Sequence, residues 1–67
     1  MDRSEVIRGL HSDLETLTRL HIRHGLHHTE GFRRQKERIS DCIREHEIDA
    51  RAELDPLVFS LYRRYFD

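Results

Sequence analysis

Two long helical patterns meet at the stretch Gly25-Leu26-His27-His28-Thr29-Glu30-Gly31. The stretch has a glycine at each end, and glycine favours the end of a helix because it adopts backbone angles that other residues avoid. Thr29 is a residue type that caps the start of a helix, since its hydroxyl can accept a free backbone N–H. The stretch therefore predicts a short turn between two helices that fold back antiparallel on each other.

Apolar residues recur at steps of three and four before this turn, which is the spacing of one helix face. Ser4 is a candidate N-cap, with Glu5 in the first turn. The pattern predicts a helix over about residues 4–27. Its apolar face comprises Val6, Ile7, Leu10, Leu14, Leu17 and Leu20, and it continues into His21, His24 and His28.

A second stripe with the same spacing follows the turn and predicts a helix over about residues 31–53. A break near Ile48 and Asp49 is the main alternative. The stripe comprises Phe32, Lys36, Ile39, Ile43, His46 and Ala50.

The dipeptide Asp55-Pro56 predicts that one helix stops and another begins. The residue before proline avoids helical angles, whereas Asp at the N-cap and Pro at the first helical position favour a new helix. A short third helix is therefore predicted over 56–66.

The chain is small and only modestly apolar, with 67 residues of which 36% are hydrophobic and 37% are charged. This composition predicts one all-α domain over residues 1–67. Burial of a Leu or Ile side chain contributes roughly 1.5–3 kcal/mol, whereas ordering each residue costs ~1.5 kcal/mol. The net free energy of folding of a two-helix hairpin alone is therefore close to zero. We therefore expect oligomerisation into a helical bundle, most simply a homodimer with four hairpin helices. Alternatively, the third helix folds back over the open side.

Charge and cysteine content point to a cytoplasmic protein without a membrane span. Twelve basic and thirteen acidic residues nearly cancel, so no net charge indicates a nucleic acid. The single Cys42 cannot form an internal disulfide, the first residues lack the apolar run of a signal peptide, and no stretch approaches the ~18 apolar residues of a membrane helix.

The sequence contains no pattern that predicts catalysis or a bound cofactor. Its serines and Cys42 lie in helical patterns without a glycine-rich elbow, and Gly25 and Gly31 fit neither nucleotide-binding fingerprint. We therefore expect a protein that is not an enzyme.

In outline, the hairpin over roughly residues 5–46 resembles small helical hairpins that act as bacterial regulators. These include the plasmid copy-number RNA-binding hairpins and the short hairpin phosphatases of sporulation phosphorelays. The phosphatases carry a Ser-Gln-Glu-Leu-Asp signature on the second helix, where the best register here reads Lys36-Glu37-Arg38-Ile39-Ser40. Only the apolar position matches, so the resemblance implies an architecture and no functional residue.

The leading hypothesis is a homo-oligomeric adaptor or regulator that binds another protein through its third helix. Exposed apolar side chains on a short terminal helix suit docking into a groove. Core packing of the same side chains is the competing interpretation. The candidate partner-binding residues are Leu57, Val58, Leu61, Tyr62, Tyr65 and Phe66.

Two alternatives rest on other residue clusters. A nucleic-acid regulator could present a basic run with a neighbouring aromatic residue across a dimer, although ion pairs on a helix surface explain the same charges. That candidate set is Phe32, Arg33, Arg34, Lys36 and Arg38.

Histidines form the second alternative, since six occur in the chain. His21, His24 and His28 would share one face of the first helix, and imidazoles one turn apart can bind Zn, Ni or Cu. His11 and His46 would lie at a similar height in the hairpin, where protonation could be sensed. Solvated histidines at a helix end are the competing explanation.

Overall fold

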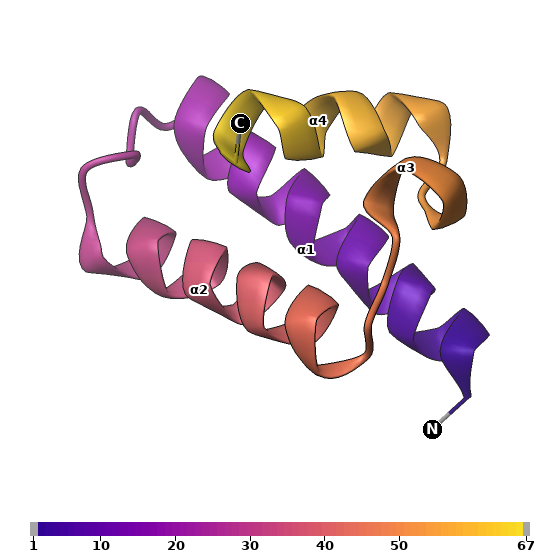
Figure 1. Ribbon diagram of the computed structural model, residues 1–67. Coiled ribbons are helices and arrows are strands. Elements are labelled where there is room, and N and C mark those ends of the chain that lie inside the picture. The colour runs from indigo at the N-terminus through magenta and orange to yellow at the C-terminus, as the bar shows by residue number, and fades with distance from the viewer. Residues whose placement is uncertain (1, 67) are drawn as a thin grey trace.

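The computed structural model describes residues 2–66, which fold into helices joined by turns, without a strand in that range (Figure 1). The all-α prediction is confirmed. In chain order the helices are α1 (Arg3–Ile22), α2 (Glu30–Glu45), α3 (Ala50–Glu53) and α4 (Pro56–Phe66).

Helix α1 differs at both ends from the predicted range of 4–27. It begins at Arg3 because the carboxylate of Asp2, and not Ser4, caps it by accepting the N–H of Glu5 at 2.9 Å. It ends at Ile22 because the chain then reverses: Gly25 has a φ of +62°, and the N–H of Leu26 donates to the carbonyl of Leu20 at 2.8 Å. The turn therefore includes residues 23–29, part of which the sequence pattern predicts to be helical.

The predicted helix over 31–53 is wrong as one continuous element, and its alternative with a break near Ile48 and Asp49 is confirmed. Thr29 caps α2 as predicted, by accepting the N–H of Phe32 at 3.3 Å. After α2 ends, Glu47 adopts a φ of +51°, which a helix cannot accommodate. Asp49 then caps the single turn of α3 by accepting the N–H of Ala52.

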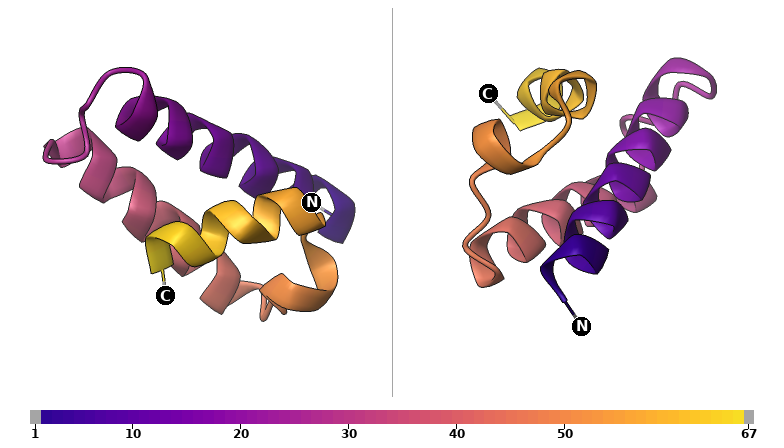
Figure 2. Two further views of the ribbon diagram at one scale, coloured as in Figure 1. Left: turned by 90° about the horizontal axis from the view of Figure 1, so that it is seen from above. Right: turned by 90° about the vertical axis from the view of Figure 1, so that its right-hand side faces the viewer.

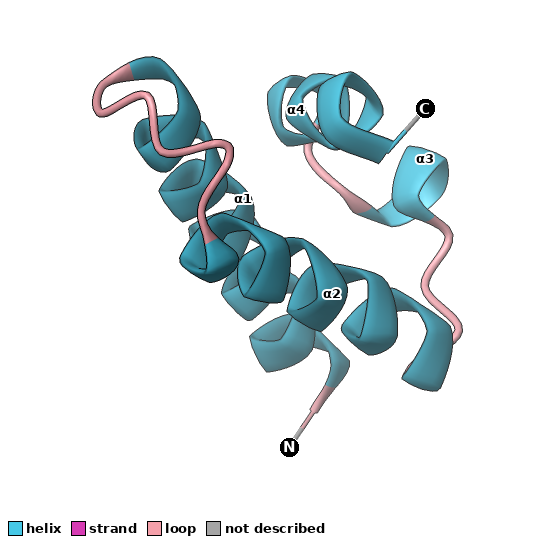
Figure 3. Cartoon of the chain, turned by 90° about the vertical axis from the view of Figure 1, so that its left-hand side faces the viewer, coloured by secondary structure: helices cyan, strands magenta, loops and turns pink. Residues whose placement is uncertain are grey.

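The third predicted helix is confirmed, with α4 spanning the same residues, 56–66. The carboxylate of Asp55 accepts the N–H of Leu57 at 3.0 Å, and Pro56 occupies the first position, where no N–H is needed. Figure 3 shows how loop segments on either side of α3 carry the chain from α2 to the start of α4.

Helix α2 turns back along α1 to form a hairpin, and α4 packs on this hairpin against α1 (Figures 1 and 2). Two contacts show that α4 runs in the same direction as α1. The backbone N of Asp55 lies 3.4 Å from His11 Nε2, and the hydroxyl of Tyr65 lies 3.1 Å from His21 Nδ1. The prediction that the third helix folds back over the hairpin is therefore confirmed.

The core draws on every helical segment except α3 and on the connections around it. The apolar stripe of α1 is confirmed, with Leu14 and Leu17 fully buried in the same core as Ile39 of α2. His46 is exposed and does not continue the stripe of α2, because α2 ends at Glu45. The buried residues are Val6, Leu10, Leu14, Leu17, Phe32, Ile39, Ile48, Leu54 and Val58.

Among residues 2–66, no helix combines the length and the hydropathy needed to cross a membrane.

Candidate functional site

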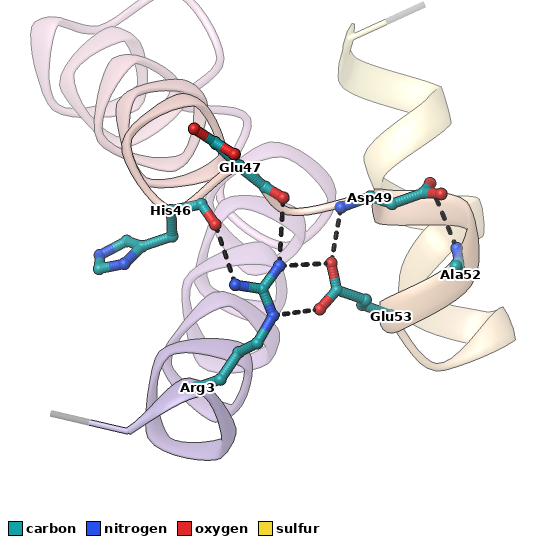
Figure 4. Close-up of polar contacts among 6 residues, drawn as sticks. All are labelled: Arg3, His46, Glu47, Asp49, Ala52 and Glu53. Carbon is teal, nitrogen blue, oxygen red and sulfur yellow. Dashed lines mark hydrogen bonds and ion pairs between the residues drawn. The ribbon is translucent and has the colours of Figure 1, made fainter.

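Arg3 connects the start of the chain to the end of α2 and to α3 (Figure 4). Its guanidinium donates to both carboxylate oxygens of Glu53 and to the carbonyls of His46 at 3.0 Å and Glu47 at 3.1 Å. The carbonyls of His46 and Glu47 lie in the turn that follows α2, and Arg3 supplies hydrogen bonds to them there. This contact fixes the position of the sharp turn between α2 and α3.

Glu53 is held in its charged form by this contact. The hydrogen bond from Arg3 and a second one from the backbone N–H of Asp49, at 2.7 Å, lower the pKa of Glu53 to about 2. The same partner raises the pKa of Arg3. The hydrogen bonds of the pair join the start of α1 to the end of α2 and to α3, as expected of a contact that stabilises the fold. Sequence reasoning missed it because the two residues lie 50 positions apart.

The structure brings together a different set of histidines from the one predicted. His21, His24 and His28 do not share a helix face, because α1 ends at Ile22 and the other two lie exposed in the turn. Instead, the ring of His27 lies between His21 and His28, with centroid distances of 4.8 and 3.9 Å. Desolvation of the ring, followed by the proximity of His28 and His21, lowers the pKa of His27.

His21 joins the three longer helices at this end of the molecule. Its Nδ1 lies within hydrogen-bond distance of the Tyr65 hydroxyl, and its ring contacts the edges of Tyr65 and Phe32 at centroid distances of 5.5 and 6.1 Å. Phe32 and Tyr65 also contact each other. In the described part of the chain, no three His, Cys, Asp or Glu side chains are grouped so that they could hold a metal ion. The metal hypothesis therefore lacks the shared face on which it depended.

The six candidate partner-binding residues of α4 do not form one surface. Val58 is buried in the core, and Tyr65 packs against His21. Tyr62 and Phe66 are half-buried on the same side of the helix as Phe59. Leu57 differs from all of these, because 80% of its surface is exposed.

Phe59, Tyr62 and Phe66 form a column of stacked rings. Successive rings lie 6.3 and 5.0 Å apart with interplanar angles of 21° and 16°. The guanidinium of Arg51 lies 5.8 Å from the Phe59 ring and the amine of Lys36 lies 5.5 Å from the Phe66 ring. Each of these cations lies at a distance from its ring that favours a cation–π contact.

The candidate nucleic-acid set is also divided between different environments. Phe32 is only 8% exposed, and Lys36 is directed at Phe66. Arg33 pairs with Glu30 at 3.5 Å, whereas Arg34 and Arg38 are exposed on α2. No described contact favours nucleic acid over a charged, solvated helix surface.

Cys42 is half-buried beside the core, as expected of a small apolar side chain. Burial raises the pKa of its thiol, and the nearby carboxylates of Asp13 and Glu45 raise it further. The neutral thiol is therefore favoured, which makes Cys42 a poor nucleophile.

One face of α1 remains uncovered and carries two open depressions. The first, of about 520 Å³, is lined by Arg3, Ser4, Ile7, Arg8, His11 and Glu53. The second, of about 250 Å³, is lined by Glu15, Thr18, Arg19, Ile22 and Arg23. In the sequence, Ile7 belongs to the apolar stripe of the first helix, and the charged residues around it form no pattern that indicates a binding face.

Comparisons with protein-family models, with curated proteins and with solved structures give no match to this chain. A functional argument therefore has to start from its surfaces.

Proposed function

We propose that this protein is a non-enzymatic helical adaptor or regulator that binds another protein through the outer face of α4. The observation that supports this proposal is the exposure of Leu57, which at 80% is the most exposed large apolar side chain of the described residues. When a partner covers an apolar side chain that is exposed to water on an ordered helix, the burial of its surface favours binding.

The rest of α4 keeps Leu57 in a fixed position. Val58, next in sequence, is buried in the core, and the carboxylate of Asp55 caps the first turn of the helix. Leu61 lies one helical turn after Leu57 and is half-buried. A partner would therefore meet a preorganised surface and would not have to order it, which favours affinity.

The homodimer predicted from the sequence is a separate part of this proposal. That prediction assumed a hairpin with one open side, whereas Val58 of α4 packs into the same core as Leu14 and Ile39. This packing supports an adaptor that acts as a single copy. Sedimentation equilibrium of the purified protein over a range of concentrations measures whether it also self-associates.

The substitution Leu57→Glu tests the binding surface, with Leu26→Glu as its matched control. Leu26 is also an exposed leucine, at 39%, but it lies in the turn after α1. Proteins captured by the wild-type chain would be identified by quantitative mass spectrometry, then purified, and their affinity measured by calorimetry.

We expect Leu57→Glu to weaken binding of a true partner by at least about tenfold and Leu26→Glu to leave it within about twofold. Circular dichroism would verify that both variants are folded. Equal binding by the wild type and Leu57→Glu would show that α4 is not the docking surface.

A further inference from the structure

We propose that the partner segment is an acidic amphipathic helix that lies along the uncovered face of α1, next to Leu57. This inference rests on the proposed adaptor function and specifies the chemistry of its partner. It draws on three properties of the α1 face, namely its shape, its apolar residues and its charge.

The two depressions lie on one continuous face of α1. Residues 4, 7, 8, 11, 15, 18, 19, 22 and 23 line them, and these positions follow one another at the steps of a single helix side. At 1.5 Å per residue, the face is ~28 Å long. A partner helix of roughly 15–20 residues would match this length, as in complexes where a helix occupies a groove.

Apolar side chains lie at both ends of this face. Ile7 lines the first depression, and Ile22, which is 60% exposed, lines the second. A third exposed apolar group, Leu57, follows two residues after Asp55, whose backbone N lies 3.4 Å from His11 Nε2 in the wall of the first depression. A helix with an apolar stripe could therefore bury side chains at each end of the face.

The charge of the face selects an acidic partner. Arg3 and Glu53 neutralise each other, and Glu15 is the one other carboxylate that lines the depressions. Arg8, Arg19 and Arg23 are exposed and form no ion pair within residues 2–66. The face is therefore basic although the whole chain has a net charge of −1. Carboxylates opposite these guanidiniums would form charge-assisted hydrogen bonds and would speed association.

The test uses two synthetic helical peptides with blocked termini as probes, and both carry leucines at steps of three and four. One carries Glu at the remaining positions, and the other carries Lys at the same positions. Binding to the full-length, isotope-labelled chain would be followed by NMR at low and high salt. The variant is Arg8→Glu/Arg19→Glu, and the matched control is Arg34→Glu/Arg38→Glu, which makes the same charge change on exposed residues of α2.

We expect the Glu probe to bind at least about tenfold more tightly than the Lys probe and to bind more weakly at high salt. Its binding should shift the NMR signals of Ile7, Ile22 and Leu57. Arg8→Glu/Arg19→Glu should weaken this binding at least about tenfold, and the α2 control should change it less than about threefold. If Arg8→Glu/Arg19→Glu does not fold, Arg8→Gln/Arg19→Gln replaces it. This variant should still lower the affinity for the Glu probe.

The proposal would be overturned if the two probes bound equally, or if the α1 and α2 variants lost the same affinity for the Glu probe. NMR shifts confined to α2 would also overturn it. A solution mass that rises with concentration, and does not rise in Arg8→Glu/Arg19→Glu, would identify a second copy as the occupant and also overturn it. If Leu57→Glu no longer binds a captured partner protein while Arg8→Glu/Arg19→Glu binds it normally, the adaptor function stands and the proposal of an acidic partner helix is wrong.

Discussion

Arg3 illustrates how one exposed side chain stabilises a fold at a point where helices end. Its guanidinium pairs with Glu53 and also caps the carbonyls of His46 and Glu47, so it fastens α1, the end of α2 and α3 together (Figure 4). At the opposite end of the molecule, His21 and Tyr65 connect α1 to α4. These two polar contacts link α3 and α4 to the hairpin.

The Arg3–Glu53 contact predicts a specific loss of stability in acid. The pKa of Glu53 is about 2 in the folded chain, compared with its usual value of 4.5. Because the folded-state pKa is the lower one, the contribution is complete above pH 4.5 and is lost as the pH falls towards 2. In urea titrations across this range, the free energy of unfolding should fall more steeply in the wild type than in Glu53→Gln.

Glu37→Gln serves as the control for this prediction. Glu37 is an exposed carboxylate of α2 that forms no ion pair within residues 2–66. Its replacement should preserve the wild-type pH dependence. If the wild type and Glu53→Gln lose stability in parallel, then Glu53 is not held by Arg3 in solution.

Helix α4 is the element in which core and exposed surface are most sharply separated. Val58 is 8% exposed and its neighbour Leu57 is 80% exposed. Val58→Ala should lower the free energy of unfolding by about 2 kcal/mol, from the lost burial of two methyl groups and the cavity that remains. Leu57→Ala should change it by less than about 0.5 kcal/mol. Urea denaturation of both variants measures the difference, and similar losses would contradict this assignment of the two faces.

The elements that the sequence predicted correctly depend on local signals. Thr29 caps α2 and Asp55 caps α4, as their residue types and neighbours indicated, and the stripe of Leu10, Leu14 and Leu17 is buried. The end of α1 was missed because the chain reverses through Gly25, whereas the helical spacing of apolar and histidine residues suggested a continued helix.

The candidate sites were harder to predict because their residues meet only through tertiary packing. His27 contacts His21 only because the turn folds back over the end of α1, and Phe32 becomes buried through contact with Tyr65. A stripe of apolar residues on α4 does not reveal which side will face α1. For these reasons the partner-binding and metal sets were assembled from residues that the fold separates.

At the scale of the whole molecule, α4 and the connection before it complete a core that the hairpin alone leaves open. Ile48, Leu54 and Val58 are buried together with Leu14 and Ile39, and the three longer helices surround this shared interior (Figure 2). The stability of the chain should therefore depend on residues beyond the hairpin. This differs from a two-helix hairpin that gains its stability from a second copy.

Deletion of residues 55–67 tests this dependence. A two-helix hairpin of this size gains about as much free energy from burial as it loses in chain entropy, so without Val58 and the contacts of Tyr65 it should not remain cooperatively folded. Far-UV circular dichroism should show a large loss of helix and a broad thermal transition. Leu57→Glu in the full chain is the control, because it alters the exposed face of α4 and should leave the transition sharp. A truncated chain that keeps a sharp transition and sediments as a dimer would show that the hairpin completes its core by self-association, as the homodimer hypothesis requires.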